Sequence, residues 1–297
     1  MITRRGLLKL LGAGFLTLVA TVAYPFSEVF GKPRITPYAL TPRGWPAGLK
    51  LRAAVIADIH ACEPWMTVSR IEAICRQTMD LEPDIILLLG DYVSGTKLVT
   101  GTVDSSEWSA ALGALKAPLG VHAILGNHDY WDDKTYQRDQ NAVPFVVEAL
   151  RNVGISTYVN EAVRIEKDGH GFWLAGLGDQ LALLPGSGRA HSQGIDDLDA
   201  TLAAITDDGP VLLMAHEPDI FPSVDHRVSL TLCGHTHGGQ LNLFGWRPFS
   251  ASRGSAAYPA GYFEVDGRAL IVSRGLGCSV LPLRIGAYPE ILLLELG

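Results

Sequence analysis

The sequence places Asp, Asn and His side chains directly after five apolar runs, where they could act together in metal chemistry. These residues are Asp58 and His60, Asp91, Asn127 with His128 and Asp129, His216, and His235 with His237. A single Asp or His at the end of a strand more often caps a turn than binds an ion. Five of the nine histidines follow apolar runs in this way, however. Turn capping alone does not explain such a pattern, so the set predicts a metal site.

The residue types indicate which metals and which reaction to expect. Carboxylate, amide and imidazole ligands without thiolate suit Mn, Fe or Zn, and so large a set implies two divalent or trivalent ions. In an extended segment, residues two apart lie on the same side, so Asp58 and His60 should both reach one ion. Two ions about 3.5 to 4 Å apart can activate a shared water and neutralise charge on a phosphoryl group. We therefore predict hydrolysis of a phosphate ester, with His128 as general acid and Asp129 orienting its ring.

Alternating strand and helix patterns must position these residues. Apolar runs predict strands over 53–57, 85–89 and 121–125, and helical spacing predicts helices over 69–81, 106–116 and 143–152. In the first of these helices, Ser69 and Glu72 form a capping-box pattern. The carboxyl ends of parallel strands open onto one crevice, which would bring the metal-capable residues together.

The second half of the chain has the pattern of a further sheet. Strands are expected over 156–159, 162–166, 172–176, 211–215, 229–233, 262–265, 269–273 and 291–294, with a helix near 196–205. The segment 184–194, which is rich in Gly and Ser, is expected to be a long surface loop.

Taken in order, the motifs resemble those of the calcineurin-like metallophosphoesterases. The motifs are Asp58-x-His60, Gly90-Asp91, Gly126-Asn127-His128-Asp129, His216 and Gly234-His235-Thr236-His237. Segments 234–240, 274–277 and 282–284 resemble the exported bacterial phosphodiesterase branch of that superfamily. The resemblance implies an α/β fold, namely a four-layer α/β/β/α sandwich of two mixed sheets flanked by helices.

The resemblance also implies a role for each site residue. Asp58, His60 and His237 would hold the first metal, Asp91 would bridge the two metals, and Asn127, His216 and His235 would hold the second. His128 would be a catalytic histidine that binds no metal. The implied reaction is attack of a metal-bridging hydroxide on a phosphate ester, with a phosphodiester as the expected substrate.

The substrate is less well defined by the sequence. Arg274 and Arg284, with Arg253 as a further candidate, could bind phosphate through two nitrogens each. Aromatic residues close to the motifs could form the wall of a substrate pocket; these are Trp65, Tyr130, Trp131, Phe244 and Trp246. An envelope lipid, a wall component or a nucleotide-type diester are the candidate substrates. Two alternatives are hydrolysis of the pyrophosphate of UDP-2,3-diacylglucosamine and a non-catalytic scaffold on the same fold.

The N-terminal residues have the composition of an export segment. Arg4 and Arg5 precede an uncharged stretch over 10–25, and the segment around them resembles a twin-arginine signal. We expect residues 1–30 to form this signal or a membrane anchor, residues 31–48 a Pro-rich linker, and residues 49–297 the phosphoesterase domain. The expected partner is the twin-arginine export machinery, with membrane association through residues 6–26. The expected location is the periplasm or the outer face of the cytoplasmic membrane. This location argues against UDP-2,3-diacylglucosamine as the substrate, because that lipid is made on the cytoplasmic side.

Charge and cysteine content argue against three other kinds of protein: nucleic-acid-binding proteins, disulfide scaffolds and proteins with thiolate zinc sites. The formal net charge is −7, and Lys and Arg are scattered, so no nucleic-acid-binding surface is predicted. The four cysteines are widely spaced, which indicates buried thiols and neither a disulfide scaffold nor a thiolate zinc site.

Overall fold

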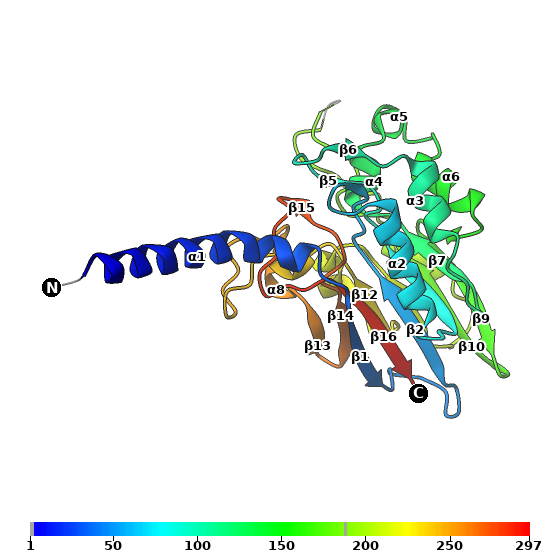
Figure 1. Ribbon diagram of the computed structural model, residues 1–297. Helices are drawn as coiled ribbons and strands as arrows, with labels where there is room; N and C mark the ends of the chain where they lie inside the picture. Colours follow the sequence, from blue (N-terminus) through cyan, green and yellow to red (C-terminus); the bar gives the residue numbers. More distant parts are fainter. Residues whose placement is uncertain (1–2, 187–188) are drawn as a thin grey trace.

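Two six-stranded sheets pack face to face, and helices cover both outer faces (Figure 1). The computed structural model describes residues 3–186 and 189–297. The layer order is therefore helices, sheet, sheet, helices, and the predicted α/β/β/α sandwich is confirmed.

The first sheet carries three of the five metal-capable segments. Its order is β1 (Arg34–Leu40), β16 (Glu290–Leu296), β2 (Leu51–Ile56), β4 (Ile85–Leu89), β7 (Val121–Ile124) and β8 (Ser156–Thr157). All neighbours are parallel except β16 and β2. Its outer face packs against α2 (Val68–Met79), α3 (Ser105–Leu112) and α6 (Phe145–Asn152).

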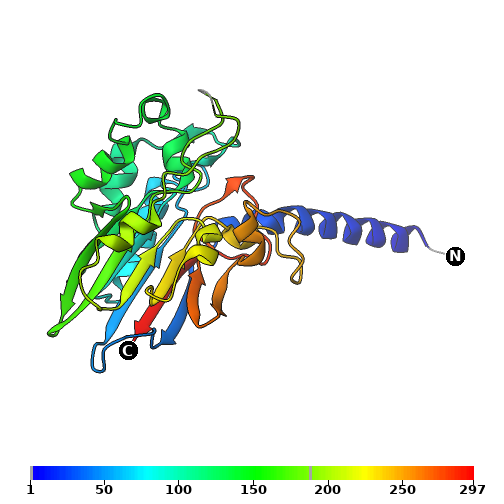
Figure 2. The same ribbon diagram turned by 180° about the vertical axis from the view of Figure 1, so that it is seen from behind.

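The second sheet carries the other two segments. Its order is β13 (Gly261–Val265), β14 (Arg268–Val272), β12 (Leu230–Cys233), β11 (Val211–Met214), β10 (His170–Gly176) and β9 (Glu161–Lys167). The four central strands are parallel, and a hairpin partner closes each edge. Its outer face packs against residues of the short helices α7 (Leu198–Ala203) and η1 (Pro218–Ser223), with α8 (Arg253–Ala257) beside η1. Figure 2 views the molecule from behind.

The alternation of side chains along the strands builds two cores on each sheet. In β2, Ala53 and Val55 point into the layer between the sheets, whereas Ala54 and Ile56 point toward the helices. The central strands of both sheets are largely apolar on both faces because both faces are covered. A slip of one residue would exchange the two cores, so the burial of both faces fixes where each strand ends.

Short elements gather at the carboxyl ends of the strands. They are β3 (Cys62–Glu63), β5 (Gly95–Thr96), β6 (Gly101–Thr102), α4 (Asn127–Trp131), α5 (Lys134–Arg138), η2 (His237–Gly239) and β15 (Ser279–Val280). Figure 1 shows most of them together at one end of the sandwich. Of the predicted loop over 184–194, residues 187 and 188 lie outside the described residues. All four cysteines are buried free thiols, as predicted.

The helices begin at residues that differ slightly from the prediction. The N-cap of α2 is Thr67, whose side chain accepts from Arg70 N, so the predicted capping box of Ser69 and Glu72 is wrong. A capping box does occur at α3, where Asp104 and Glu107 satisfy each other's backbone amides. Ser69 with Glu72 and Asp104 with Glu107 both have the capping-box spacing, but α2 begins two residues earlier than Ser69, at the hydroxyl of Thr67.

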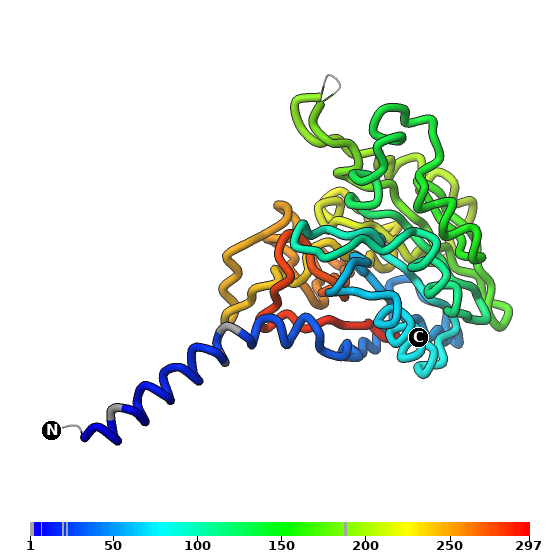
Figure 3. The backbone as a smooth tube through the Cα atoms, turned by 45° about the horizontal axis from the view of Figure 1, so that its top comes forward, coloured from blue at the N-terminus to red at the C-terminus, as the bar shows by residue number. Residues whose placement is uncertain are grey.

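The N-terminal helix α1 (Arg4–Val29) projects away from the sandwich (Figure 3). It is long and apolar enough to cross a membrane, a test that signal sequences also meet. Its C-terminal end touches the domain: Phe26 and Phe30, the residue that follows the helix, pack on Trp65, with ring centroids 5.9 and 5.4 Å away. Val29 is buried there. Residues 1 and 2 of the predicted signal lie outside the described residues.

The segment predicted as a linker, residues 31–48, is largely part of the domain. Its residues Arg34–Leu40 form β1, which pairs in parallel with all seven residues of β16. Pro37, the one proline in β1, is compatible with this because β1 is an edge strand, where a missing amide is tolerated. The prediction of an exposed linker is therefore wrong for these residues, and the domain begins near residue 34.

This arrangement predicts the effect of truncation. A chain that begins at Leu49 lacks β1, leaving one edge of β16 unpaired and Glu290 without its bond from Thr36 Oγ1, which is 2.6 Å long. We expect it to unfold at least about 5 °C below a chain that begins at Lys32, measured by calorimetry. Equal unfolding temperatures would show that residues 34–40 add nothing to the domain.

Candidate metal centre

The five metal-capable segments converge where strands of both sheets end. Asp58 and His60 follow β2, Asp91 follows β4, Asn127 begins α4 after β7, His216 follows β11, and His235 and His237 follow β12. All seven side chains belong to residues that are at most 7% exposed. The topology thus brings together the residues that the sequence analysis selected.

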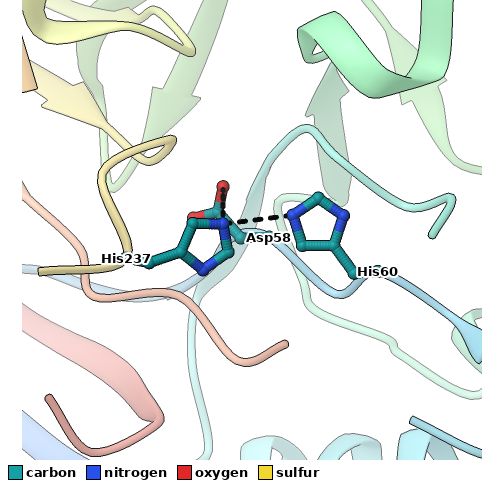
Figure 4. Close-up of side chains that lie close together, drawn as sticks. All are labelled: Asp58, His60 and His237. Atoms are coloured by element: carbon teal, nitrogen blue, oxygen red, sulfur yellow. Dashed lines mark hydrogen bonds and ion pairs between the residues drawn. The ribbon is translucent and has the colours of Figure 1, made fainter. Parts of the chain in front are cut away.

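Asp58, His60 and His237 form one group of possible metal ligands (Figure 4). The Nε2 atoms of His60 and His237 are 3.1 Å apart, and His237 Nε2 lies 3.9 Å from Asp58 Oδ1. His60 Nδ1 donates to the carbonyl oxygen of Val93 over 2.8 Å, because a carbonyl can only accept. Its Nε2 lone pair is thereby turned toward the group, as in metal-binding histidines.

His216 and His235 form a second group with Glu217, and Asn127 lies beside it. His235 Nδ1 is 3.0 Å from Asn127 Oδ1. His216 Nδ1 donates to the carbonyl oxygen of Leu89 over 2.7 Å, which again leaves Nε2 facing the site.

Asp91 lies between the two groups. Its Oδ2 is 3.4 Å from His60 Nε2 and 3.2 Å from His216 Nε2. Its Oδ1 accepts from the backbone amide of His128 over 2.9 Å. One carboxylate oxygen therefore faces ligands of both groups.

The electrostatics of these groups fit a cation. Burial raises the pKa of Asp58 to about 7 and lowers those of His60 and His235 to about 4 and 3. Burial also opposes ionisation of Asp91, but the imidazoles of His216 and its neighbours hold the Asp91 pKa well below its usual range. A metal requires neutral imidazoles around an ionised carboxylate. His60 and His235 meet this requirement beside Asp91, whereas, against the effect of burial, Asp91 raises the pKa of His216, whose proton a cation would replace.

Unsatisfied buried atoms support the same conclusion. Asp58 Oδ2 and His216 Nε2 are buried and have no hydrogen-bond partner among the described residues. Leaving such groups unpaired in a protein interior costs free energy. Two ligand atoms that are each about 2.1 Å from one ion, at an octahedral angle, lie about 3 Å from each other. The Nε2 atoms of His60 and His237 have this separation, as do Asn127 Oδ1 and His235 Nδ1. The residues therefore fit bound metal ions.

The backbone at the site is unusual. Asp58, His60, Asp91, His235 and His237 all have positive φ, between 50° and 66°. Such values are uncommon for residues with a side chain and cluster at functional sites. The sequence predicts Asp58 and His60 on the same side of an extended segment; the chain curls after the strand instead, yet both side chains do reach one group. His235 and His237, which have the same spacing, reach different groups.

Two glycines make room for the centre. Gly90 has φ +90°, and a Cβ there would lie 2.7 Å from the backbone carbon of Leu125. A Cβ on Gly126 would lie 2.6 Å from His216 Cε1. Gly90 thus lies against the chain that follows the neighbouring strand of its own sheet, and Gly126 lies against His216 of the second sheet. A larger residue at either position would displace this part of the centre.

His128 lies at the rim of the centre, beside the groups described above. Its ring is 5.1 Å from the ring of His60 and 4.9 Å from that of Trp131, in edge contact with each. Its Nε2 lies 3.2 Å from the hydroxyl of Ser279. This nitrogen therefore points across the centre to the loop that contains β15.

Asp129 does not orient His128. Its carboxylate accepts from the backbone amides of Asp91, Tyr92, Val93 and Gly126, at 2.9, 2.8, 3.3 and 2.9 Å. The predicted role is wrong because, at the third position of α4, the side chain folds back over the helix start. Asp129 instead fixes the loop that carries Asp91.

The predicted phosphate-binding arginines have other partners. Arg284 is fully buried and donates to the carbonyl oxygens of Gly277, Ala287 and Arg274, so its predicted contact with substrate is wrong. Arg274 pairs with Glu290 over 2.6 Å, and its contact with phosphate stays a prediction. Arg253 begins α8.

The predicted aromatic wall divides into three parts. Trp65 is covered by the end of α1, and Tyr130 is buried in the core. Trp131 contacts His128. Only Phe244 and Trp246 are largely exposed beyond the last ligand.

Three residues of the site were not predicted from the sequence. Glu217 is fully buried in the second group, and burial raises its pKa. Ser279 contacts His128, and Gln240 Oε1 accepts from Ser279 N over 2.6 Å. Glu217 was detectable as the neighbour of His216, but no spacing rule pointed to Ser279, which lies 42 residues after His237.

Comparisons with known proteins agree with this geometry. The family model "Calcineurin-like phosphoesterase" matches residues 51–239. The chain is 31% identical to the phosphodiesterase YaeI of Escherichia coli, over 81% of this chain and 80% of that protein. It is 28% identical to the uncharacterized metallophosphoesterase YkuE of Bacillus subtilis, over 85% and 80%. It is 29% identical to a Danio rerio transmembrane protein with a metallophosphoesterase domain, over 93% of this chain and 61% of that protein.

The geometry of Asp129 leads to a prediction that separates it from His128. Asp129→Asn would turn an amide N–H₂ group toward backbone N–H groups, leaving buried donors unpaired. We expect the metal-free variant to unfold about 5 °C lower than the parent protein by calorimetry. His128→Ala is the matched control and should shift the unfolding temperature by less than half as much. An equal shift in both variants would contradict the structural role of Asp129.

Proposed function

The chain belongs to the calcineurin-like phosphoesterase family, and we propose that it is a phosphodiesterase with a two-metal centre. The observation that carries this proposal is the position of Asp91 between two groups of buried ligands. A single metal ion would need only one of these two ligand groups, so the presence of both supports two ions. Within the family, metal-dependent hydrolysis of phosphate esters follows from the same ligand set.

We assign Asp58, His60 and His237 to one ion, Asn127, His216 and His235 to the other, and Asp91 to both. When bound, two such ions polarise a phosphoryl group and lower the pKa of the attacking water. Mn, Fe and Zn all accept these ligands. The protein holds the ligands in place with backbone carbonyls at His60 and His216.

His128 is the proposed proton donor to the leaving group. It lies beside the ligand cluster with its Nε2 facing Ser279, so a substrate over the centre would place its leaving oxygen near this nitrogen. Ser279 is a positioning residue, because its hydroxyl holds the His128 ring. General acids of this kind contribute roughly 10²- to 10⁴-fold to the rate.

A diester is favoured over a monoester by the similarity to YaeI, which is named a phosphodiesterase. The pyrophosphate bond of UDP-2,3-diacylglucosamine is the alternative substrate. A non-catalytic scaffold is disfavoured because every ligand position is present and a partly satisfied metal cage would cost stability.

We propose that α1 directs export through the twin-arginine pathway and then anchors the domain on the outer face of the cytoplasmic membrane. Arg4, Arg5 and Lys9 lie at one end of α1, which fits retention of that end inside. The other end packs against the domain through Phe26, Val29 and Phe30.

The metal requirement gives a direct test. The metal-stripped full chain should not hydrolyse bis-p-nitrophenyl phosphate, and Mn, Zn or Fe should restore hydrolysis in preference to p-nitrophenyl phosphate. Asp91→Ala should lower kcat/KM by more than about 100-fold, since loss of a residue behind the ligands already costs 10- to 100-fold. Absence of turnover with every metal in a folded protein would overturn the phosphodiesterase proposal.

The proton-donor role of His128 predicts a dependence on the leaving group. In His128→Ala, kcat should fall about 100-fold or more for a phenyl ester, whose leaving group needs a proton. The fall should be much smaller for a p-nitrophenyl ester, which leaves as a stable anion. Ser279→Ala should show the same trend more weakly. Equal losses for both esters would show that His128 acts in some way other than proton transfer.

A further inference from the structure

An apolar pocket opens directly beside the metal centre. It has a volume of about 300 Å³ and borders on His237 and Ser279. Leu241, Phe249, Val280, Leu281 and Leu283 supply its apolar walls. Pockets of this size and lining bind apolar parts of small molecules, and the neighbouring polar groups fix their orientation. A phosphate at the centre would thus have space for a hydrocarbon group beside it.

The two loops that supply Phe249 and Val280 to the pocket carry exposed apolar side chains, and we call these side chains the rim. Phe244 is fully exposed, and Trp246, Phe249 and Val280 are 64%, 62% and 71% exposed. Exposed large side chains gathered on two adjoining loops mark a contact surface. Val280 also has φ +63°, a value that is strained for a β-branched residue and typical of functional loops.

The charge of these loops fits an anionic lipid surface. The segment from Gly239 to Gly261 contains Arg247 and Arg253 and no Asp or Glu. The chain as a whole has a net charge of −7, so this segment departs from the average. Aromatic and basic residues together are the composition that enters the interface of anionic membranes.

The N-terminal helix leaves the domain beside the same surface. The amide of Arg284 donates to the carbonyl oxygen of Pro25 in α1 over 3.2 Å, and Arg284 directly follows the pocket residue Leu283. Figures 1 and 2 show α1, β15 and the loop between β12 and β13 on one side of the domain. The candidate membrane helix and the pocket rim therefore face the same side.

We propose that this pocket binds the hydrocarbon chain of a lipid phosphodiester while the rim rests on the membrane that α1 spans. The proposal rests on the phosphodiesterase function proposed above and specifies its substrate class. The hydrocarbon chain of the lipid would enter between Phe249 and Leu281, and its phosphate would reach the metal ligands near His237. A soluble diester would lack the contact with the pocket walls.

The first test uses the full chain in vesicles of phosphatidylcholine and phosphatidylglycerol, with p-nitrophenyl butyl and octyl phosphate as substrates. Burying four more methylenes should raise kcat/KM at least tenfold for the octyl ester. Phe249→Ser, and separately Leu281→Ser, should reduce the octyl-to-butyl ratio at least fivefold. Because each variant meets the same lipid, partitioning of the esters into the vesicles cancels in this comparison.

The second test needs no catalysis. Vesicles with bromine in their acyl chains should quench the fluorescence of Trp246 by at least half, obtained as the difference between the parent protein and Trp246→Phe. The difference for Trp173→Phe is the matched control and should show no quenching, because Trp173 is buried on the second sheet.

The outcomes separate the two proposals. Turnover of bis-p-nitrophenyl phosphate with equal rates for butyl and octyl esters would keep the phosphodiesterase function and overturn the lipid pocket. An unquenched Trp246 would overturn the membrane contact. If no ester is hydrolysed with any metal, the proposed function fails, and quenching of Trp246 alone then decides whether the rim contacts the membrane.

Discussion

The structure depends on one electrostatic constraint: two carboxylates, Asp58 and Asp91, lie buried among imidazoles where the sheets meet. A buried charge is costly unless an opposite charge accompanies it. Without a metal, the Asp91 carboxylate holds the pKa of His216 well above its usual value against the effect of burial. Metal ions can supply that positive charge instead. The centre is therefore stable only with a cation or a proton present.

The same constraint explains the local backbone. To direct carboxylate and imidazole groups from five strand ends into one buried volume, the chain curls immediately after the strands, which accounts for the positive φ at Asp58, His60 and Asp91. Such conformations persist only where the surroundings hold them. Asp129 provides part of this support, since its carboxylate accepts from the backbone amides of residues 91–93. Val93 provides another part, since its carbonyl oxygen accepts from the ring of His60.

The sequence was sufficient for the layers and the ligand cluster because both follow from strand periodicity and from where each strand ends. It failed where tertiary contacts override local composition. Pro37 in β1 and the prolines on either side of the strand indicated a linker, but pairing with β16 outweighed them. Arg284 had the pattern of a phosphate ligand, although its neighbours are backbone carbonyls of a loop that the sequence could not place. Ser279 reaches His128 only because that loop folds back over the centre.

Substrate choice is separated from metal binding by this design. The ligands lie at the ends of strands between two cores, whereas the segments around Leu241 and Leu281 contact the centre chiefly through Ser279, at His128, and Arg284, at His237. These two segments are joined to each other, since Ile285 N donates to the carbonyl oxygen of Gln240 over 2.8 Å. They form a unit whose apolar pocket side chains can change while these two contacts are kept. In the proposed lipid phosphodiesterase, specificity would depend on this unit and on the side of the domain to which α1 attaches, while the chemistry shared with the family would stay with the strands.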